Sequence, residues 1–220
     1  MLKGRMDYLN NKNFKKLIYK NSLGTNLEIG LPEGHKWISG GEKSKSGIDF
    51  IANIPTEEIF TMPHREKVNG TLVSSKPFIY GGSTIIHFTL RFVEGKVVEY
   101  SAQTGEEILG KLLDMDEGAR YLGEVALVEY NSPISKSEKV FYNNLYDENA
   151  SCHLALGGAY PTCISGSENQ SEEELKNRGM NNSLIHEDFM IGTADMEIIG
   201  VDSEGNETLI MKDGNFAFTI

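Results

Sequence analysis

Short apolar and β-branched runs separated by polar turns dominate the pattern of this chain, and they predict β-strands. The strongest signal lies between Gly70 and Tyr100, where Glu94-Gly95 divides FTLRFVEGKVVEY into the two strands of a hairpin. Two further hairpins are predicted, one from 14–20 and 26–31 and one from 196–201 and 207–211. Single strands are expected at 48–54, where Pro55 ends the run, at 124–130 and at 152–156.

Helical patterns are fewer than strand patterns. In 104–115, Thr104 stands three residues before Glu107, as in a capping box, and apolar residues follow at helical spacing. The other expected elements are the end of a helix at 1–11, a polar loop at 40–47, a polar helix around 137–149, and a surface loop with a short helix at 167–177.

Strands outnumber helices, and consecutive strands are joined mostly by hairpins rather than by crossover helices. This pattern predicts an α+β domain built on a mainly antiparallel, barrel-like sheet with a few helices. No internal repeat or linker divides the sequence, so we expect one domain over 1–220. The chain opens within a charged helical pattern, with no cap before Met1, and this suggests a fragment.

Composition narrows the choice of partners and compartment. The 220 residues include 32 Asp and Glu against 21 Lys and Arg, a net charge of −11. Such a charge repels phosphate backbones and anionic lipid, so neither nucleic acid nor a membrane is expected as a partner. The chain has no apolar run of about 18 residues, and its two cysteines, Cys152 and Cys163, are too few for a disulfide scaffold. A cytoplasmic location is expected.

Histidines and carboxylates supply the candidate chemistry. His186 and Asp188 stand two residues apart in LIHEDFMIG, so a strand would project both from one face and Glu187 from the other. His153 lies in the apolar run SCHLALGG, where a neutral imidazole bonded to a backbone group is the plain alternative.

Two carboxylates stand next to apolar strands. Glu124 lies between Gly123 and VALV, and Glu58 precedes Ile59-Phe60. A carboxylate there is costly unless it is paired, protonated or bound to a metal, although each alone is more often a strand-end residue that reaches solvent. Together with His153, His186 and Asp188, they form the mixed set that zinc, cobalt or manganese ions select.

The remaining candidates are weaker. His64 lies on a predicted loop, His87 in a predicted strand, and His35 after a turn. The cysteines lack the spacing of a structural zinc site. The Gly-Gly pairs do not make a phosphate-binding loop, and no Gly-x-Ser-x-Gly elbow is present.

Longer stretches of the sequence carry a family resemblance. They are NSLGTNLEIGLPEGHKW, FIANIPTEEIFTMPHRE, YLGEVALVEYNSPIS, NNLYDENASCHLALGGAYP, GMNNSLIHEDFMIGT and MEIIGVDSEG. In these stretches, which run through nearly the whole chain, the sequence resembles the metallo-aminopeptidases of the aminopeptidase T and aminopeptidase S type. Proteins of that type are roughly twice as long, and the chain resembles their carboxy-terminal, metal-binding half.

The resemblance implies roles for the same residues. Glu58 would be a metal ligand, Glu124 the ligand shared by two ions, and His153, His186 and Asp188 would complete a dinuclear site. Tyr160 would lie beside the site and donate a hydrogen bond to the developing oxyanion. For the carboxylate that anchors the substrate's α-amino group or moves protons, Glu57 is a candidate, although it should face away from Glu58 on an extended segment.

The expected function is therefore a two-metal aminopeptidase that removes amino-terminal residues from peptides. In the full-length family, the missing amino-terminal domain is expected to help enclose the site in a homodimer. The rivals are another dinuclear metal amidohydrolase and a non-catalytic β-rich assembly domain. Because strands fix side-chain directions, we expect the five ligand side chains to converge even without an ion.

Overall fold

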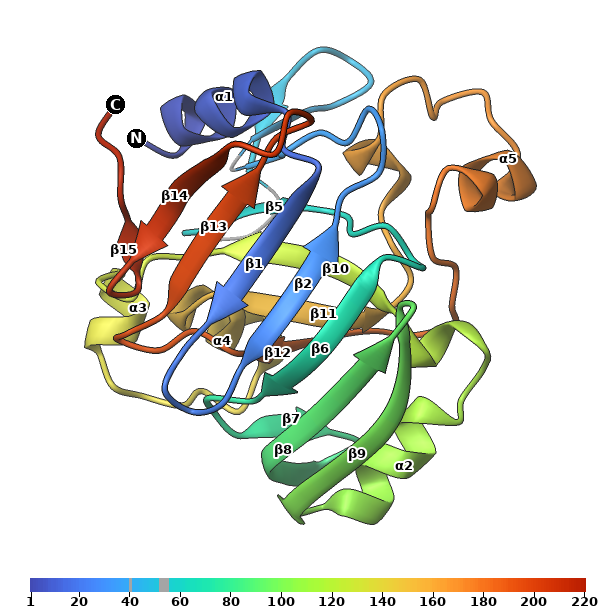
Figure 1. Cartoon of the computed structure of the whole chain (residues 1–220), viewed down its shortest axis with the longest axis vertical. Helices are drawn as coiled ribbons and strands as arrows, with labels where there is room; N and C mark the ends of the chain where they lie inside the picture. Colours follow the sequence, from blue (N-terminus) through green and yellow to red (C-terminus); the bar gives the residue numbers. More distant parts are fainter. Residues whose placement is uncertain (40, 52–55) are drawn as a thin grey trace.

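Two antiparallel sheets form most of the molecule. The structure is a computed structural model of the chain and describes residues 1–39, 41–51 and 56–220. In the larger sheet the strands follow the order β15-β14-β13-β1-β2-β6-β8-β7, with β9 also paired to β8 (Figure 1). Its strands are β1 (Lys16–Lys20), β2 (Asn26–Gly30), β6 (Val68–Val73), β7 (Phe78–Tyr80), β8 (Ser83–Val93), β9 (Lys96–Thr104), β13 (Glu197–Val201), β14 (Glu207–Lys212) and β15 (Asn215–Phe216).

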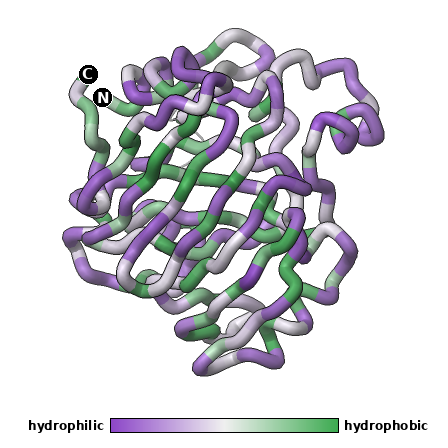
Figure 2. The backbone as a smooth tube through the Cα atoms, viewed as in Figure 1, coloured by the Kyte–Doolittle hydropathy of each residue, from purple (hydrophilic) through white to green (hydrophobic). Residues whose placement is uncertain are grey.

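The smaller sheet crosses behind the larger one (Figure 1). It has the order β12-β11-β10-β5 and consists of β5 (Ile59–Thr61), β10 (Leu122–Leu127), β11 (His153–Gly157) and β12 (His186–Met190). Leu17 and Leu27 of the larger sheet belong to the same buried core as Val125 and Leu154 of the smaller sheet. Figure 2 shows apolar backbone stretches along the crossing strands and hydrophilic stretches mainly in the loops. The core between the sheets thus fixes the smaller sheet in place.

Short helices lie around these sheets. They are α1 (Leu2–Lys12), α2 (Glu106–Leu113), α3 (Pro133–Lys136), α4 (Asn144–Asp147) and α5 (Glu172–Asn177), with 3-10 turns at η1 (Gly118–Arg120), η2 (Glu148–Ala150) and η3 (Pro161–Cys163). Tyr8 of α1 stacks on Phe218 with ring centroids 4.0 Å apart, so the two chain ends lie together (Figure 1). Within the described ranges, every helix is too short or too polar to cross a bilayer.

The predicted fold class and the three hairpins are confirmed. β1 pairs with β2, β8 with β9 and β13 with β14, all antiparallel. At the β8–β9 turn, Glu94 and Gly95 have φ of 48° and 82°, the left-handed pair that a tight hairpin requires. The larger sheet ends at β15 on one side and at β7 and β9, which both pair with β8, on the other, so in the described part of the chain it stays open instead of closing into a barrel.

The helix in 104–115 is confirmed, but its predicted cap is wrong. Thr104 is the last residue of β9, where it pairs with Ile86, and the sheet pairing prevents it from capping a helix. The helix begins instead after Gly105, at φ 80°, and no side chain caps it. The Glu106 carboxylate accepts a hydrogen bond from the Ala102 N–H at 3.0 Å, which ties the helix start to the strand.

Two other segments differ from expectation. In 48–54, the described residues hold only the two-residue strand β4 (Asp49–Phe50), which pairs with β3 (Glu42–Lys43) inside the segment 40–47 that was predicted as a loop. Gly40 and residues 52–55 lie outside the described ranges. Around 137–149 there is no single helix. Ser132 and Asn143 each cap a separate one-turn helix, α3 and α4, and Glu138 and Tyr142 have φ of 53° and 57°, which a right-handed helix cannot contain.

Candidate metal centre

The five side chains that the sequence singled out lie together on one face of the smaller sheet. Strand pairing explains why. Ala155 in the central strand β11 is opposite Glu124 of β10 on one side and opposite Asp188 of β12 on the other. Residues directly opposite each other project from the same face, and so do residues two apart on one strand, such as Asp188 and His186 or Ala155 and His153. The small Ala155 side chain leaves room between the two carboxylates.

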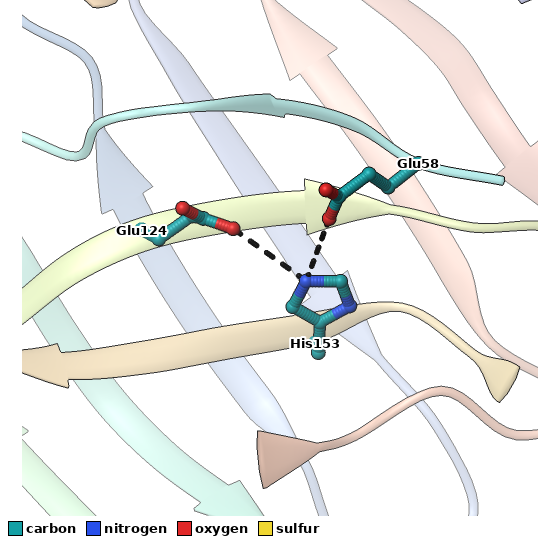
Figure 3. A group of neighbouring side chains, drawn as sticks. All are labelled: Glu58, Glu124 and His153. Atoms are coloured by element: carbon teal, nitrogen blue, oxygen red, sulfur yellow. Dashed lines mark ion pairs between the residues drawn. The ribbon is translucent and has the colours of Figure 1, made fainter. Parts of the chain in front are cut away.

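Glu124 stands between the two histidines. Its Oε1 lies 3.5 Å from Nε2 of His153, and its Oε2 lies 3.6 Å from Nε2 of His186. Glu58, from the segment just before β5, places Oε2 3.0 Å from the same His153 nitrogen (Figure 3). Asp188 places Oδ1 3.6 Å from Nε2 of His186. Each histidine therefore faces two carboxylates, and Glu124 is common to both.

A sixth side chain completes the cluster, and the sequence reasoning missed it. Three groups of residues each bring one potential ligand atom per residue within 4.8 Å of the others in the same group. The groups are Glu58, Glu124 and His153; Glu124, His186 and Asp188; and Glu148, His153 and Asp188. Glu148 is buried in the turn η2, five residues before His153. Glu148 lies in the polar run YDENAS, whose composition does not indicate a buried residue. The one feature that could have selected Glu148 is its position in the turn that leads into the strand of His153.

The other nitrogen of each histidine fixes its orientation. Nδ1 of His153 lies 3.2 Å from the Ser151 carbonyl oxygen, and Nδ1 of His186 lies 2.7 Å from that of Gly158. A carbonyl oxygen only accepts, so Nδ1 carries the hydrogen and donates it. In the neutral ring, the lone pair of Nε2 then faces the carboxylates, as in histidines that bind metal ions.

Electron pairs thus face each other across the cluster. Among the residues that the structure describes, Glu58 Oε2, His153 Nε2 and Asp188 Oδ1 are buried without a hydrogen-bond partner. Such atoms need a proton or a cation between them. Imidazole nitrogens and carboxylate oxygens suit zinc, cobalt and manganese, so the residues present fit a divalent metal.

Protons meet this need when no cation is bound. Burial raises the pKa of Glu124 to about 7, and the nearby Asp188 and Glu58 carboxylates raise it too. Burial likewise raises the pKa of Glu148 to about 8. For the histidines, burial acts against the charged ring, but the carboxylates outweigh it: the pKa of His186 rises to about 9, and that of His153 rises well above its usual value. All four shifts favour the form of the cluster that holds more protons.

A cavity of about 360 Å³ gives access to the cluster. Its walls include Glu58, Glu124, Glu148, His186 and Asp188, with apolar Ile51, Phe60 and Leu145 around them. The predicted Tyr160 is also a wall residue, and its ring lies 4.7 Å from that of His186, centroid to centroid. Burial and the neighbouring carboxylates raise the pKa of the Tyr160 hydroxyl to about 12. The hydroxyl therefore stays protonated and can donate a hydrogen bond.

Glu57 is not brought to the cluster. Thr56 and Glu58 on either side of it line the cavity, whereas Glu57 does not, as alternation on an extended segment predicts. The backbone N–H of Glu57 instead donates to the side chain of Asn149 at 2.8 Å. Its catalytic role stays a prediction that the cavity does not support. His35 is buried and bonded to the Pro32 carbonyl, a structural arrangement.

Known proteins resemble this chain over nearly all of its length. "Aminopeptidase 2" from Geobacillus stearothermophilus is 53% identical over 215 residues, which are 98% of this chain and 52% of that protein. Aminopeptidase AmpS from Bacillus subtilis is 49% identical, over 97% of this chain and 52% of that protein. The solved structure of AmpT from Thermus thermophilus superposes with a TM-score of 0.93 at 43% identity, over 98% of this chain and 53% of that one.

The chain therefore spans about half the length of the curated relatives it matches. The family model described as thermophilic metalloprotease (M29) matches residues 1–216. Because this model covers nearly the whole chain and a relative is 53% identical over 98% of it, the chain belongs to the thermophilic metalloprotease (M29) family.

Proposed function

We propose that this chain is the catalytic, metal-binding domain of an aminopeptidase that removes amino-terminal residues from peptides with water activated by two divalent ions. The observation that carries the proposal is the position of Glu124, whose two oxygens face different histidines, each of which also faces another carboxylate. A carboxylate can bridge two ions about 3.5–4 Å apart. Relatives named aminopeptidases in a metalloprotease family support the same activity.

Each ion would have its own ligands. Glu58 and His153 would hold one ion, His186 and Asp188 the other, and Glu124 would be shared by both. Glu148 groups with His153 of the first set and Asp188 of the second, so it would lie between the two sets. Zinc, cobalt and manganese all suit this mixed set of oxygen and nitrogen ligands. When bound, such ions supply Lewis acidity and lower the pKa of a bound water to about 7.

Other groups of the chain would stabilise the reacting carbonyl group and hold the histidine ligands in place. The Tyr160 hydroxyl, protonated because its pKa is about 12, would donate a hydrogen bond to the carbonyl oxygen as it gains negative charge, an effect of about 10²–10³ in rate for comparable donors. The Nδ1–H bonds from His153 and His186 to backbone carbonyls would hold both rings in place during turnover.

Further expectations about the whole protein belong to the same proposal. Residues 1–220 would be the carboxy-terminal domain of a longer enzyme, and an amino-terminal domain would help enclose the site in a homodimer. A cytoplasmic location is supported by the free, buried thiols of Cys152 and Cys163.

Metal analysis and a pair of matched peptides test the proposal. The purified chain, freed of metal and then given zinc, cobalt or manganese, should bind two equivalents. It should release the first residue of a peptide with a free amino group and leave the same peptide untouched when that amine is acetylated. Cleavage of the acetylated peptide at a similar rate would indicate a different amidohydrolase. Absence of stoichiometric metal would favour a non-catalytic assembly domain.

A further inference from the structure

Asn149 joins two ligand-bearing segments that lie far apart in the sequence. Its Oδ1 accepts the N–H of Glu57 at 2.8 Å across a separation of 92 residues, and Glu57 directly precedes Glu58. Asn149 itself directly follows Glu148. Glu58 and Glu148 belong to ligand groups that share His153. One side chain thus connects the backbones that present two of the cluster's carboxylates.

Both polar ends of the amide are bonded, and the side chain is fully enclosed. Asn149 is 0% exposed, and its Nδ2 donates to the Leu145 carbonyl at 3.2 Å. Its own main-chain oxygen accepts a hydrogen bond from the Ser132 hydroxyl at 3.0 Å. A buried side chain with both polar ends bonded has little freedom to move, so it can set the spacing of the two segments.

Electrostatics favours an amide at this position. The carboxylates of Glu58, Glu124, Glu148 and Asp188 surround His153 and His186, and like charges this close repel one another. A neutral side chain can hold the two segments together without adding another negative charge, as an aspartate would.

We infer that Asn149 is a positioning residue of the metal centre, which holds the segment of Glu58 against that of Glu148 so that both carboxylates reach the ions. This inference rests on the proposed function, since it presupposes that the cluster binds metal. Asn149 is not among the residues that line the cavity, so its effect would pass through the two glutamates.

Cobalt(II) binding tests the inference without relying on catalysis. The affinity is measured by competition with a chromophoric chelator, and the coordination geometry by the visible absorption of the bound ion. Asn149→Ala, which removes both side-chain bonds, should weaken cobalt binding by about 10–100-fold, the usual effect of losing a partner that orients ligands. It should also change the visible spectrum.

Asn143→Ala is the matched control. Asn143 lies in the same segment and caps α4 by accepting the Leu145 N–H at 3.1 Å, but it makes no bond to Glu57 or to its neighbours among the described residues. This variant should lower the melting temperature while its cobalt affinity stays within about twofold of the wild type. If Asn149→Ala does not fold, as judged by circular dichroism, Asn149→Ser, whose side chain is shorter but polar, takes its place in the comparison.

The outcomes separate the two proposals. A wild-type chain that binds cobalt while Asn149→Ala binds it equally well, with the same spectrum, overturns the positioning role alone. Equal losses in Asn149→Ala and Asn143→Ala also overturn it, because the effect would then be a general loosening of the segment. A wild-type chain that binds no cobalt overturns the proposed function and the positioning role together.

Discussion

The carboxylate of Glu124 faces His153 with one oxygen and His186 with the other, so its loss should affect both halves of the metal centre. We expect Glu124→Ala to lose bound metal and activity together, since two cations without a shared anion repel each other. Titration calorimetry measures the number of ions bound. The control is Glu28→Ala, an exposed glutamate that pairs with Lys16 on the other sheet. Two equivalents retained by Glu124→Ala would contradict the bridging role.

Tyr160→Phe should separate catalysis from metal binding. The substitution removes only the hydroxyl and keeps the ring that packs against His186. Metal content should not change, whereas kcat should fall by about 10²–10³ with a smaller change in KM, because the lost bond would form mainly in the transition state. Tyr142→Phe, at an exposed tyrosine that does not line the cavity, is the control. An unchanged kcat would give Tyr160 a structural role only.

Stabilisation by metal should grow as the pH rises from about 5 to 8. In the metal-free chain, the raised pKa values of Glu124, Glu148, His153 and His186 mean that the folded state holds more protons than the unfolded state. Their contribution to stability is therefore lost as pH rises. A metal ion must displace these protons, so its affinity rises with pH.

The measurement is the difference in melting temperature with saturating metal and with chelator at each pH. The lowered pKa values of His35 and His64 have the opposite effect on stability, but they act in both samples and cancel in the difference. We expect the difference to increase by several degrees over this range. A difference that stays constant or shrinks would show that protons do not compete with the ion.

Local sequence patterns were enough to select most residues of the cluster. His186 and Asp188 share a face because of strand alternation alone, and Glu58 and Glu124 stand out as carboxylates beside apolar runs. Glu148 could not be selected in this way, because its burial depends on how the turn η2 packs against β12 in the folded chain. The hydrogen bond between Asn149 and Glu57 joins residues 92 positions apart, so no local sequence pattern predicts it.

At the scale of elements, the β8–β9 hairpin depends on Gly95. Its φ is 82°, and a Cβ atom there would overlap the Arg65 carbonyl oxygen. Gly205, at φ 87° in the turn between β13 and β14, has no atom within 4 Å of such a Cβ. Gly95→Ala should therefore lower the melting temperature clearly more than Gly205→Ala, which pays only backbone strain of about 1 kcal/mol, or roughly 2–4 °C. Thermal unfolding of both variants checks this. Equal shifts would mean that the neighbouring backbone yields.

Elements defined by local turns were predictable from the sequence. Elements for which one segment can adopt two alternative structures were not. The hairpins follow from short polar turns between apolar runs, a pattern that needs no partner elsewhere. Thr104 had two possible roles, cap or strand, and its pairing with Ile86 decided for the strand. In 137–149, the polar pattern suits a helix, but two separate caps and two residues at positive φ divide the segment.

At the scale of the whole molecule, the chain spans about half the length of its curated relatives. Its buried core joins both sheets, so we expect the 220 residues to fold and bind metal alone. Hydrolysis should nevertheless be slower than in a full-length relative, because walls that position the substrate can supply several kcal/mol of the barrier. Parallel aminopeptidase assays with saturating zinc, cobalt or manganese measure this. Equal rates would show that the half of the relatives that this chain does not match is not needed for catalysis.

The six side chains of the cluster come from segments spread between Glu58 and Asp188, and these segments meet only in the folded chain. Bound ions would thus cross-link distant parts of the chain and close loops of many tens of residues. Closing such loops in the unfolded chain is costly in entropy. A growing or partly unfolded chain would lack the centre altogether, so the ion can be captured only when folding is nearly complete, and its release should follow global unfolding rather than local fraying.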